Sequence, residues 1–248
     1  MTHRASKRSK AQSLADQPSA EAAPVRHRLP RGAREERIVQ EAAALFAEVG
    51  FEAPTRLLAQ RLGVTQALLY RYFPSKQRLL ERVFDRAFAR LQSLAADPRL
   101  VDRTLSLEDR LIGFYRGYLA RISFTSMRLF VRAGLGGGDL ARRFSVPLTE
   151  RLLAPVIEEL RYAAGLPGSG ERPLMRGERE LAMALHGGIV FLATRKYVYG
   201  MPMPDDLSDL VALQVRAYLP GALEELRRLH GNAGEPTLTV RQLDRRRR

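Results

Sequence analysis

GVTQALLYRYFPSK, residues 63–76, is the stretch that decides how this chain folds. Gly63 can end a preceding helix, because it has no Cβ to oppose a left-handed backbone. Thr65 can then cap a new helix through its hydroxyl, and Ser75 can cap another. The segment between these two caps is therefore predicted to be one short helix.

This short helix has one buried face and one outward face. Leu69 and Phe73 are four positions apart, so they share a face and are predicted to be buried. Gln66, Ala67 and Arg71 are left to face outward. In a DNA major groove, glutamine can bond adenine, arginine can bond guanine, and a small alanine can meet the thymine methyl group. These three residues are the candidates for base contacts, although such a face could also simply be solvated.

Three further helices surround it. A helix is predicted from about Thr55, and two helices joined by a glycine-containing turn are typical of the helix-turn-helix, whose second helix enters the major groove. Apolar residues at helical spacing predict another helix upstream, at about 34–49, and one downstream that starts at Ser75. Together they form one compact unit at about 34–90.

This unit resembles the DNA-binding domain of the tetracycline-repressor (TetR) family of bacterial regulators. Order, spacing and residue type agree over about forty positions. The family usually has serine or threonine beside the position of Pro54, so the first motif helix is expected to start on Pro54-Thr55. It often has histidine where this chain has Tyr72. The residues that carry the resemblance are Ala42, Leu45, Phe46, Gly50, Phe51, Ala59, Gly63, Val64, Thr65, Leu69, Tyr70, Tyr72, Phe73 and Lys76.

Other residues of the motif are candidates for contacts with DNA phosphates. Tyr70 and Tyr72 are two positions apart, so both cannot be buried, and at least one hydroxyl should face the DNA backbone. Lys76 lies in the first turn of its helix, where the helix macrodipole disfavours a cation. Its position therefore indicates a nearby phosphate, and the resemblance supports the same assignment. The full set of phosphate candidates is Thr55, Arg56, Thr65, Tyr70, Tyr72 and Lys76.

Composition and charge set limits on the rest of the chain. The 248 residues are 45% hydrophobic, contain no cysteine and carry a net charge of +14. Residues 1–33 carry +5 and have no apolar periodicity, and residues 232–248 carry +3, although Leu238, Val240 and Leu243 could form a short local element. Both are predicted to be disordered basic tails, either merely solvated or adding phosphate contacts. No apolar run reaches the roughly 18 residues of a membrane span, and no secretory signal is present, so a soluble cytoplasmic protein is expected.

The remaining segment, 91–231, contains only helical patterns, so we predict an all-α protein with a helical regulatory and dimerisation domain after the helix-turn-helix domain. Long apolar helices at about 178–199 and 206–229 are expected to pack against the same pair of a second copy as a four-helix interface. Gly187 and Gly188 would allow close approach. The apolar residues expected at this interface are Leu185, Ile189, Leu192 and Leu213.

Sites of other kinds are poorly supported. The four histidines have no metal-ligand spacing, no catalytic residue set stands out, and the glycine run at 134–138 lacks the Lys-Ser/Thr of a phosphate loop. We therefore expect no metal, no cofactor and no enzyme activity. Aromatic residues of the C-terminal helices are either plain core or the lining of an effector pocket. The candidate pocket residues are Tyr115, Tyr118, Phe130 and Phe191.

The resemblance implies a homodimer that binds a palindromic DNA operator, usually represses, and releases it when a small-molecule effector enters the C-terminal domain. The main alternative is a constitutive DNA-binding protein without a ligand, whose C-terminal core would be packed without a cavity. An enzyme would need a catalytic set that the sequence does not show. A pure protein-interaction module would not bind duplex DNA in a salt-sensitive way.

Overall fold

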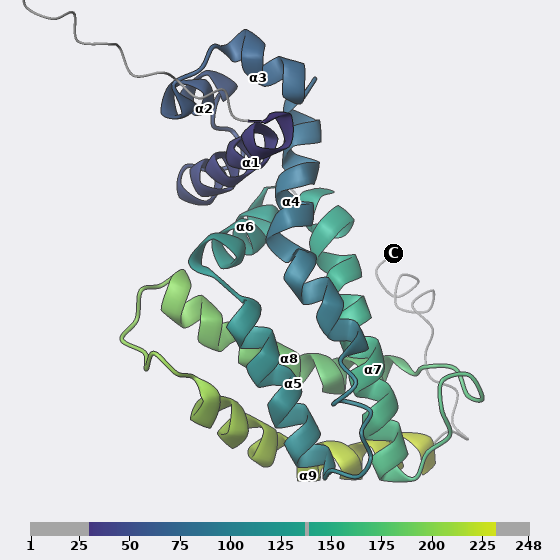
Figure 1. Cartoon of the computed structure of the whole chain (residues 1–248). Helices are drawn as coiled ribbons and strands as arrows, with labels where there is room; N and C mark the ends of the chain where they lie inside the picture. The colour runs from purple at the N-terminus through teal and green to yellow at the C-terminus, as the bar shows by residue number, and fades with distance from the viewer. Residues whose placement is uncertain (1–29, 137–138, 232–248) are drawn as a thin grey trace, which may run out of the picture.

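The structure, a computed structural model, describes residues 30–136 and 139–231, and every regular element in those ranges is helical (Figure 1). This confirms the all-α fold class. The two predicted tails lie largely outside the described residues, but the first helix begins at Arg31 rather than Arg34. The helices are α1 (Arg31–Glu48), α2 (Thr55–Leu62), α3 (Gln66–Tyr72), α4 (Lys76–Gln92), α5 (Leu107–Arg121), α6 (Phe124–Leu135), α7 (Val146–Ala164), α8 (Arg176–Tyr197) and α9 (Ser208–Gly231).

The caps of the helix-turn-helix lie where the sequence predicts them. Gly63 ends α2 with a left-handed φ of 65°, a conformation that costs glycine little. Thr65 starts α3, and its hydroxyl oxygen accepts a hydrogen bond from the Leu68 N–H at 3.2 Å. Ser75 starts α4 in the same way, with the Arg78 N–H as donor at 3.2 Å. These caps fix the length and direction of α3.

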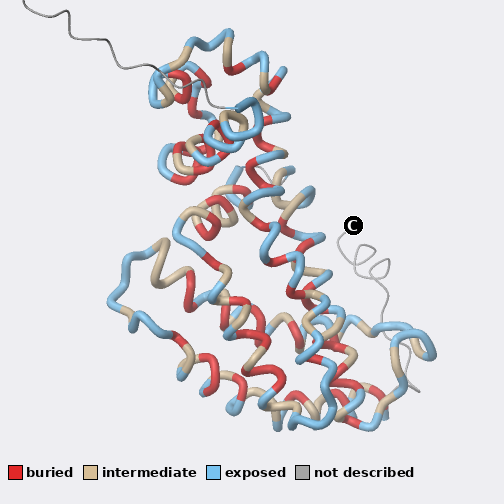
Figure 2. Tube along the Cα trace, in the orientation of Figure 1, coloured by how far each residue is buried: buried red, intermediate tan, exposed pale blue. Residues whose placement is uncertain are grey.

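The first hydrophobic core lies between α1, α2, α3 and the first half of α4. Phe46, Leu58, Leu69 and Leu79 are each no more than 1% exposed within it. Leu129, from α6 of the C-terminal domain, is also part of this core and has no exposed surface. The buried faces of these helices turn toward one another in Figure 2. The core of the helix-turn-helix domain therefore includes a side chain supplied by the second domain.

The second and larger core lies among α5 to α9. The second half of α4 enters it through Phe88 and Leu91, so α4 runs through both cores (Figure 1). Phe114, Val156 and Val211 are at most 1% exposed at its centre. In the described part of the chain, no helix is long and apolar enough to cross a membrane.

Prolines mark the start of α7 and lie inside two helices. A π-helical turn, Ala141–Ser145, precedes α7, and Pro147 follows in its first turn, where the missing N–H is not needed. Pro155 and Pro220 lie within the continuous helices α7 and α9.

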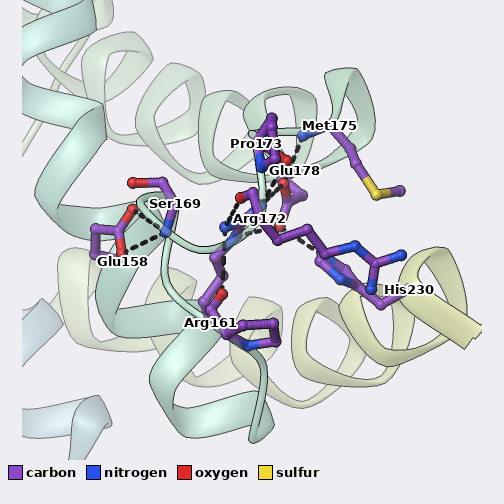
Figure 3. A network of polar contacts seen from close by, with 9 residues as sticks. Glu158, Arg161, Ser169, Arg172, Pro173, Met175, Glu178 and His230 are labelled. Atoms are coloured by element: carbon purple, nitrogen blue, oxygen red, sulfur yellow. Dashed lines mark hydrogen bonds and ion pairs between the residues drawn. The ribbon is translucent and has the colours of Figure 1, made fainter.

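A buried ion pair closes the far end of the C-terminal domain (Figure 3). The Arg161 guanidinium of α7 donates to both carboxylate oxygens of Glu178 on α8, each at 2.6 Å, and both side chains are 0% exposed. Arg161 also donates to the backbone carbonyls of Pro167, Arg172 and Pro173 in the loop between the two helices. One guanidinium thus holds the α7–α8 loop at three of its carbonyl groups.

Glu178 ties two further elements to this pair. It accepts the backbone N–H of Met175 at 2.7 Å and lies 2.8 Å from Nε2 of His230, near the end of α9. Burial raises the pKa of the Glu178 carboxyl, but the hydrogen bonds from Arg161, Met175 and His230 and the positive charge of Arg161 outweigh burial, and the pKa falls to about 2. The carboxylate is therefore charged at any ordinary pH.

Candidate nucleic-acid interface and regulatory core

The three candidates for base contacts lie on the outer face of α3. Gln66, Ala67 and Arg71 are all exposed, whereas Leu69 on the opposite face is 1% exposed. Ala67 and Arg71 are four positions apart, so they share one face of the helix. α3 forms the end of the molecule opposite to α9 (Figure 1). Nothing in the described part of the chain covers this face.

Thr55 differs from its expected role. It is only 8% exposed, and its hydroxyl oxygen accepts a hydrogen bond from Nε2 of Gln66 at 2.8 Å. The same oxygen lies 3.2 Å from the hydroxyl of Tyr70. The structure therefore corrects the expectation that Thr55 is a surface phosphate ligand, because its side chain faces α3.

The other phosphate candidates surround α3 with different degrees of exposure. Arg56, Thr65 and Tyr70 are exposed, although the Thr65 hydroxyl already caps α3. Tyr72 and Lys76 are half-buried, and the ring of Tyr72 packs against the first core. These five residues border the exposed face of α3, and their contacts with phosphate remain predictions.

The cationic side chains near α3 are of two kinds, those that form ion pairs within the protein and those that do not. Arg61 and Arg78 form ion pairs with glutamates of their own domain. In the described residues no ion pair is formed by Arg56, Arg71 or Lys76. Cations without an internal partner are suited to phosphate oxygens, which attract them by charge and by hydrogen bonds.

Two arginines of α6 connect the C-terminal domain to α1. Nε of Arg128 and Nε of Arg132 donate to the Ala47 carbonyl at 3.0 and 3.1 Å, and Nη2 of Arg132 donates to the Glu48 carbonyl at 2.7 Å. These carbonyls lie at the end of α1, where a helix leaves its last acceptors without intrahelical donors. The sequence carries no signal for this contact, because the partners are backbone atoms more than 80 positions away.

The four candidate effector residues do not form one site. Tyr115 is 0% exposed, and its ring centroid is 6.4 Å from that of Tyr118. Tyr118 and Phe130 line a cavity of about 10 Å³ between α4, α5, α6 and α7. Phe191 is 50% exposed and packs on Tyr199 instead. The structure thus brings Tyr115, Tyr118 and Phe130 near one another and places Phe191 on the surface.

Polar atoms without partners lie beside Tyr118. The hydroxyls of Tyr115 and Tyr218 and Nδ1 of His186 are buried and have no hydrogen-bond partner among the described residues. Burial raises the pKa of both tyrosine hydroxyls and lowers the pKa of His186 to about 4, so this cluster is uncharged near neutral pH. No group of three or more potential metal ligands occurs in the residues that the structure covers.

The predicted dimer residues are mostly internal. Leu185, Ile189 and Leu192 are at most 3% exposed and belong to the core of their own chain. The helical period places them on the inner face of α8, and apolarity alone does not distinguish that face from an interface. Only Leu213, at 62% exposed, is available to a partner. The structure therefore corrects the expectation that Leu185, Ile189 and Leu192 lie at a dimer interface.

A different set of residues forms an outward apolar face on α8 and α9. Ala184, Gly187 and Phe191 are exposed along α8, and Leu213 and Ala217 are exposed along α9. A Cβ atom added at Gly187 would meet nothing within 4 Å. The face is therefore open and carries small side chains beside two large apolar ones.

Comparison with known proteins agrees with this geometry. Residues 38–83, which span most of α1 to the middle of α4, match the profile of bacterial regulatory proteins of the tetR family. The HTH-type transcriptional repressor KstR of Rhodococcus jostii is 41% identical over 66 residues, which are 26% of this chain and 31% of that protein. The chain thus matches about a third of the length of this curated relative.

Two solved structures resemble the chain over more of its length. A TetR-like regulator from Rhodococcus sp. RHA1 aligns with 78% of this chain and all of its own, with a TM-score of 0.59 and 24% identity. The fatty acid degradation regulator FadR from Bacillus halodurans aligns with 78% of this chain and 98% of its own, with a TM-score of 0.59 and 16% identity. At these identities the likeness establishes the fold.

The fold and the exposed α3 define a helix-turn-helix protein whose second domain is a separate helical unit. Residues 38–83 match the tetR family of bacterial regulatory proteins, and the overall fold is similar to that of a solved TetR-like regulator.

Proposed function

We propose that this chain is a sequence-specific, DNA-binding transcriptional regulator that acts in the cytoplasm as a repressor and binds a palindromic operator as a homodimer. One observation carries the proposal: Gln66, Ala67 and Arg71 are exposed on a short helix that is fixed by caps on both sides. The similarity to KstR, a transcriptional repressor, supports the sign of regulation.

Selection of binding sites from random DNA tests this function. If Gln66 and Arg71 read bases, Gln66→Ala and Arg71→Ala will each change the preferred bases at defined positions of the site. Each lost bidentate contact is expected to cost about 1–3 kcal/mol on the selected sequence. Equal losses on selected and random duplexes would remove these residues from base reading.

Lys76→Ala tests the phosphate contact. A phosphate contact carries no base information, so we expect weaker binding to all duplexes and a salt slope shallower by about one. Arg90→Ala is the matched control, because Arg90 is an exposed cation on the same helix near its other end. If the two variants bind alike, Lys76 does not touch the backbone.

The outward face of α8 and α9 supports the dimer. Two copies joined there would bury Phe191 and Leu213, which are 50% and 62% exposed in one chain, and the symmetry would match a palindromic site. Phe191→Glu with Leu213→Glu should give a monomer in sedimentation experiments at micromolar concentration. Val101→Glu, at an exposed apolar residue outside this face, should remain a dimer. A wild-type monomer would contradict the assignment.

We further propose that a small-molecule effector enters the C-terminal core and releases the DNA. Tyr115, His186 and Tyr218 have buried polar atoms without partners among the described residues, and such groups are rare unless a ligand or water satisfies them. Their lack of charge favours a neutral effector that carries hydroxyl or carbonyl groups. An effector would have to bind one arrangement of the protein better than the other in order to shift it.

The cavity beside Tyr118 indicates how binding could reach the DNA-binding domain. At about 10 Å³ it accommodates roughly one water molecule, so an effector must displace its walls. Phe88 and Leu91 of α4 and Met127 and Phe130 of α6 form part of these walls. Those helices also contact the DNA-binding domain, so their displacement would move α3.

The same small cavity favours the alternative, a constitutive DNA-binding protein without a ligand, whose core would be packed. Calorimetry with neutral hydroxylated or carbonyl compounds, with and without the selected duplex, separates the two functions. An effector must lower DNA affinity, and DNA must lower effector affinity, by the same factor, expected at about 5–150-fold. Equal effector affinity in both experiments would support the constitutive protein.

A further inference from the structure

Thr55 connects two exposed residues of α3 although it is itself almost buried. Its hydroxyl oxygen is 2.8 Å from Nε2 of Gln66 and 3.2 Å from the hydroxyl oxygen of Tyr70. Gln66 and Tyr70 are exposed, and Thr55 is 8% exposed. Thr55 is the first residue of α2, so one α2 side chain holds two α3 side chains in a fixed relation.

One of the two hydrogen bonds among these three residues has an assigned donor. Gln66 donates through its amide nitrogen, so the Thr55 oxygen is an acceptor there. Between Thr55 and Tyr70 either hydroxyl can be the donor, because the Thr55 oxygen has a second lone pair. Gln66 keeps its carbonyl oxygen and one amide hydrogen for partners outside the protein, and Tyr70 keeps its own proton for such a partner when Thr55 is the donor.

We propose that Thr55 is a positioning residue for DNA reading, which holds Gln66 with its amide oxygen toward the base edges and Tyr70 with its hydroxyl proton toward the DNA backbone. The inference rests on the proposed DNA-binding function. A glutamine side chain held in one rotamer before binding loses less conformational freedom on binding than a free one. Thr55 would thus raise the affinity for one base pair without touching DNA.

The orientation of Gln66 also identifies the base it reads. An amide oxygen accepts from the N6 amino group of adenine or the N4 amino group of cytosine. Only adenine also offers N7 to the remaining amide hydrogen. We therefore expect adenine at the position that Gln66 contacts, and guanine or thymine, which present carbonyl acceptors there, to be disfavoured.

Thr55→Val and Thr55→Ser form the matched test. Valine keeps the shape and β-branching of threonine but has no hydroxyl, whereas serine keeps the hydroxyl. For the sequence selected by the wild-type protein, Thr55→Val should bind roughly tenfold more weakly and lose the preference for adenine. Its binding to random duplexes should be unchanged, and Thr55→Ser should bind as the wild-type protein does.

A second substitution separates positioning from direct contact. If Thr55 acts through Gln66, adding Thr55→Val to a Gln66→Ala protein causes no further loss on the selected sequence. Additive losses, or equal losses on selected and random duplexes, would show that Thr55 contacts DNA itself and would overturn the inference. A selected guanine or thymine at this position would overturn the assigned orientation.

Tyr70→Phe gives a second test that does not depend on how a substitution at the nearly buried Thr55 affects folding. Tyr70 is exposed, so losing its hydroxyl should not disturb the fold. This variant should bind all duplexes more weakly by a similar factor and keep the adenine preference. A changed base preference would contradict the backbone role of Tyr70. If the wild-type protein enriches no sequence at all, the proposed function fails; if it does and Thr55→Val keeps the same base preference, only this inference fails.

Discussion

The α7–α8 loop and the junction between the two domains both depend on arginine, but they use it differently. Arg161 has no exposed surface and is paired with Glu178, a buried charge of opposite sign. Arg132 at the junction is only half-buried and donates to the neutral carbonyls of Ala47 and Glu48. The Arg161–Glu178 contact pairs two opposite charges away from water. The Arg132 contact instead joins one charge to neutral carbonyl groups at a helix end that water can reach.

The two contacts differ in what happens when one partner is removed. A buried charge without its partner is costly, because water cannot replace the lost interaction. The carbonyls at a helix end can turn to water instead. The Arg161–Glu178 pair therefore cannot be opened cheaply, whereas the Arg132 hydrogen bonds can be exchanged for water at a small energetic cost.

The largest expected effect is that of Glu178→Gln. The substitution keeps the shape of the side chain but leaves Arg161 without its counter-charge, so the free energy of unfolding should fall by about 3–5 kcal/mol. Thermal unfolding measures the loss. Glu180→Gln is the control, since Glu180 is exposed two positions further along α8, and it should change stability little. Equal midpoints for the two variants would show that the network is dispensable.

Acid should remove the same contribution without a mutation. The pKa of Glu178 is about 2 in the folded protein and about 4.3 in an unfolded chain. A lowered folded pKa adds stability above the unfolded pKa, here about 3 kcal/mol, which is lost as pH falls toward 2. The difference in unfolding free energy between the wild-type protein and Glu178→Gln should therefore shrink between about pH 5 and pH 2. A difference that stays constant over this range would contradict the assigned pKa.

A smaller effect is expected at the junction. Arg132→Ala removes two hydrogen bonds to α1, and because water can reach the freed carbonyls we expect a loss of about 1 kcal/mol in chemical denaturation. Arg151→Ala, at an exposed arginine of α7, is the control and should be close to neutral. A loss as large as that of Glu178→Gln would mean that the junction is as rigid as the loop.

The smallest effect should come from a surface pair. Arg86 of α4 pairs with Glu36 of α1, and their side chains are 38% and 47% exposed. A double-mutant cycle with Arg86→Ala and Glu36→Ala should give a coupling of about 0.2–1 kcal/mol, and high salt should reduce it further. A coupling energy larger than the stability loss of Arg132→Ala would show that the surface pair contributes more to stability than the junction does.

Local signals predicted most of the fold. Gly63, Thr65 and Ser75 act through their own backbone or an N–H three positions away, so their roles are visible in a short stretch of sequence. The outward positions of Gln66 and Arg71 follow from helical period in the same way. Where the cause of a structure lies within one turn of helix, the sequence is sufficient to predict it.

The errors arise where the cause is distant. Leu185 and Leu213 are equally apolar, but the first faces the core of its own chain and the second faces outward, and only the packing of α8 and α9 decides which. Thr55 is turned toward α3 by a hydrogen bond from Gln66, eleven positions away. The pairing of Arg161 with Glu178 crosses a loop whose course no periodic pattern encodes.

Leu129 has a practical consequence for building chimeric regulators. Its side chain comes from α6 but fills the core of the DNA-binding domain, and Phe88 and Leu91 at the far end of α4 fill the core of the other domain. A cut after α4 would therefore leave an unfilled space in one fragment and expose aromatic and aliphatic surface on it. A graft that exchanges recognition helices should carry only α2, the turn and α3, and leave the α4–α6 contact with its original partner.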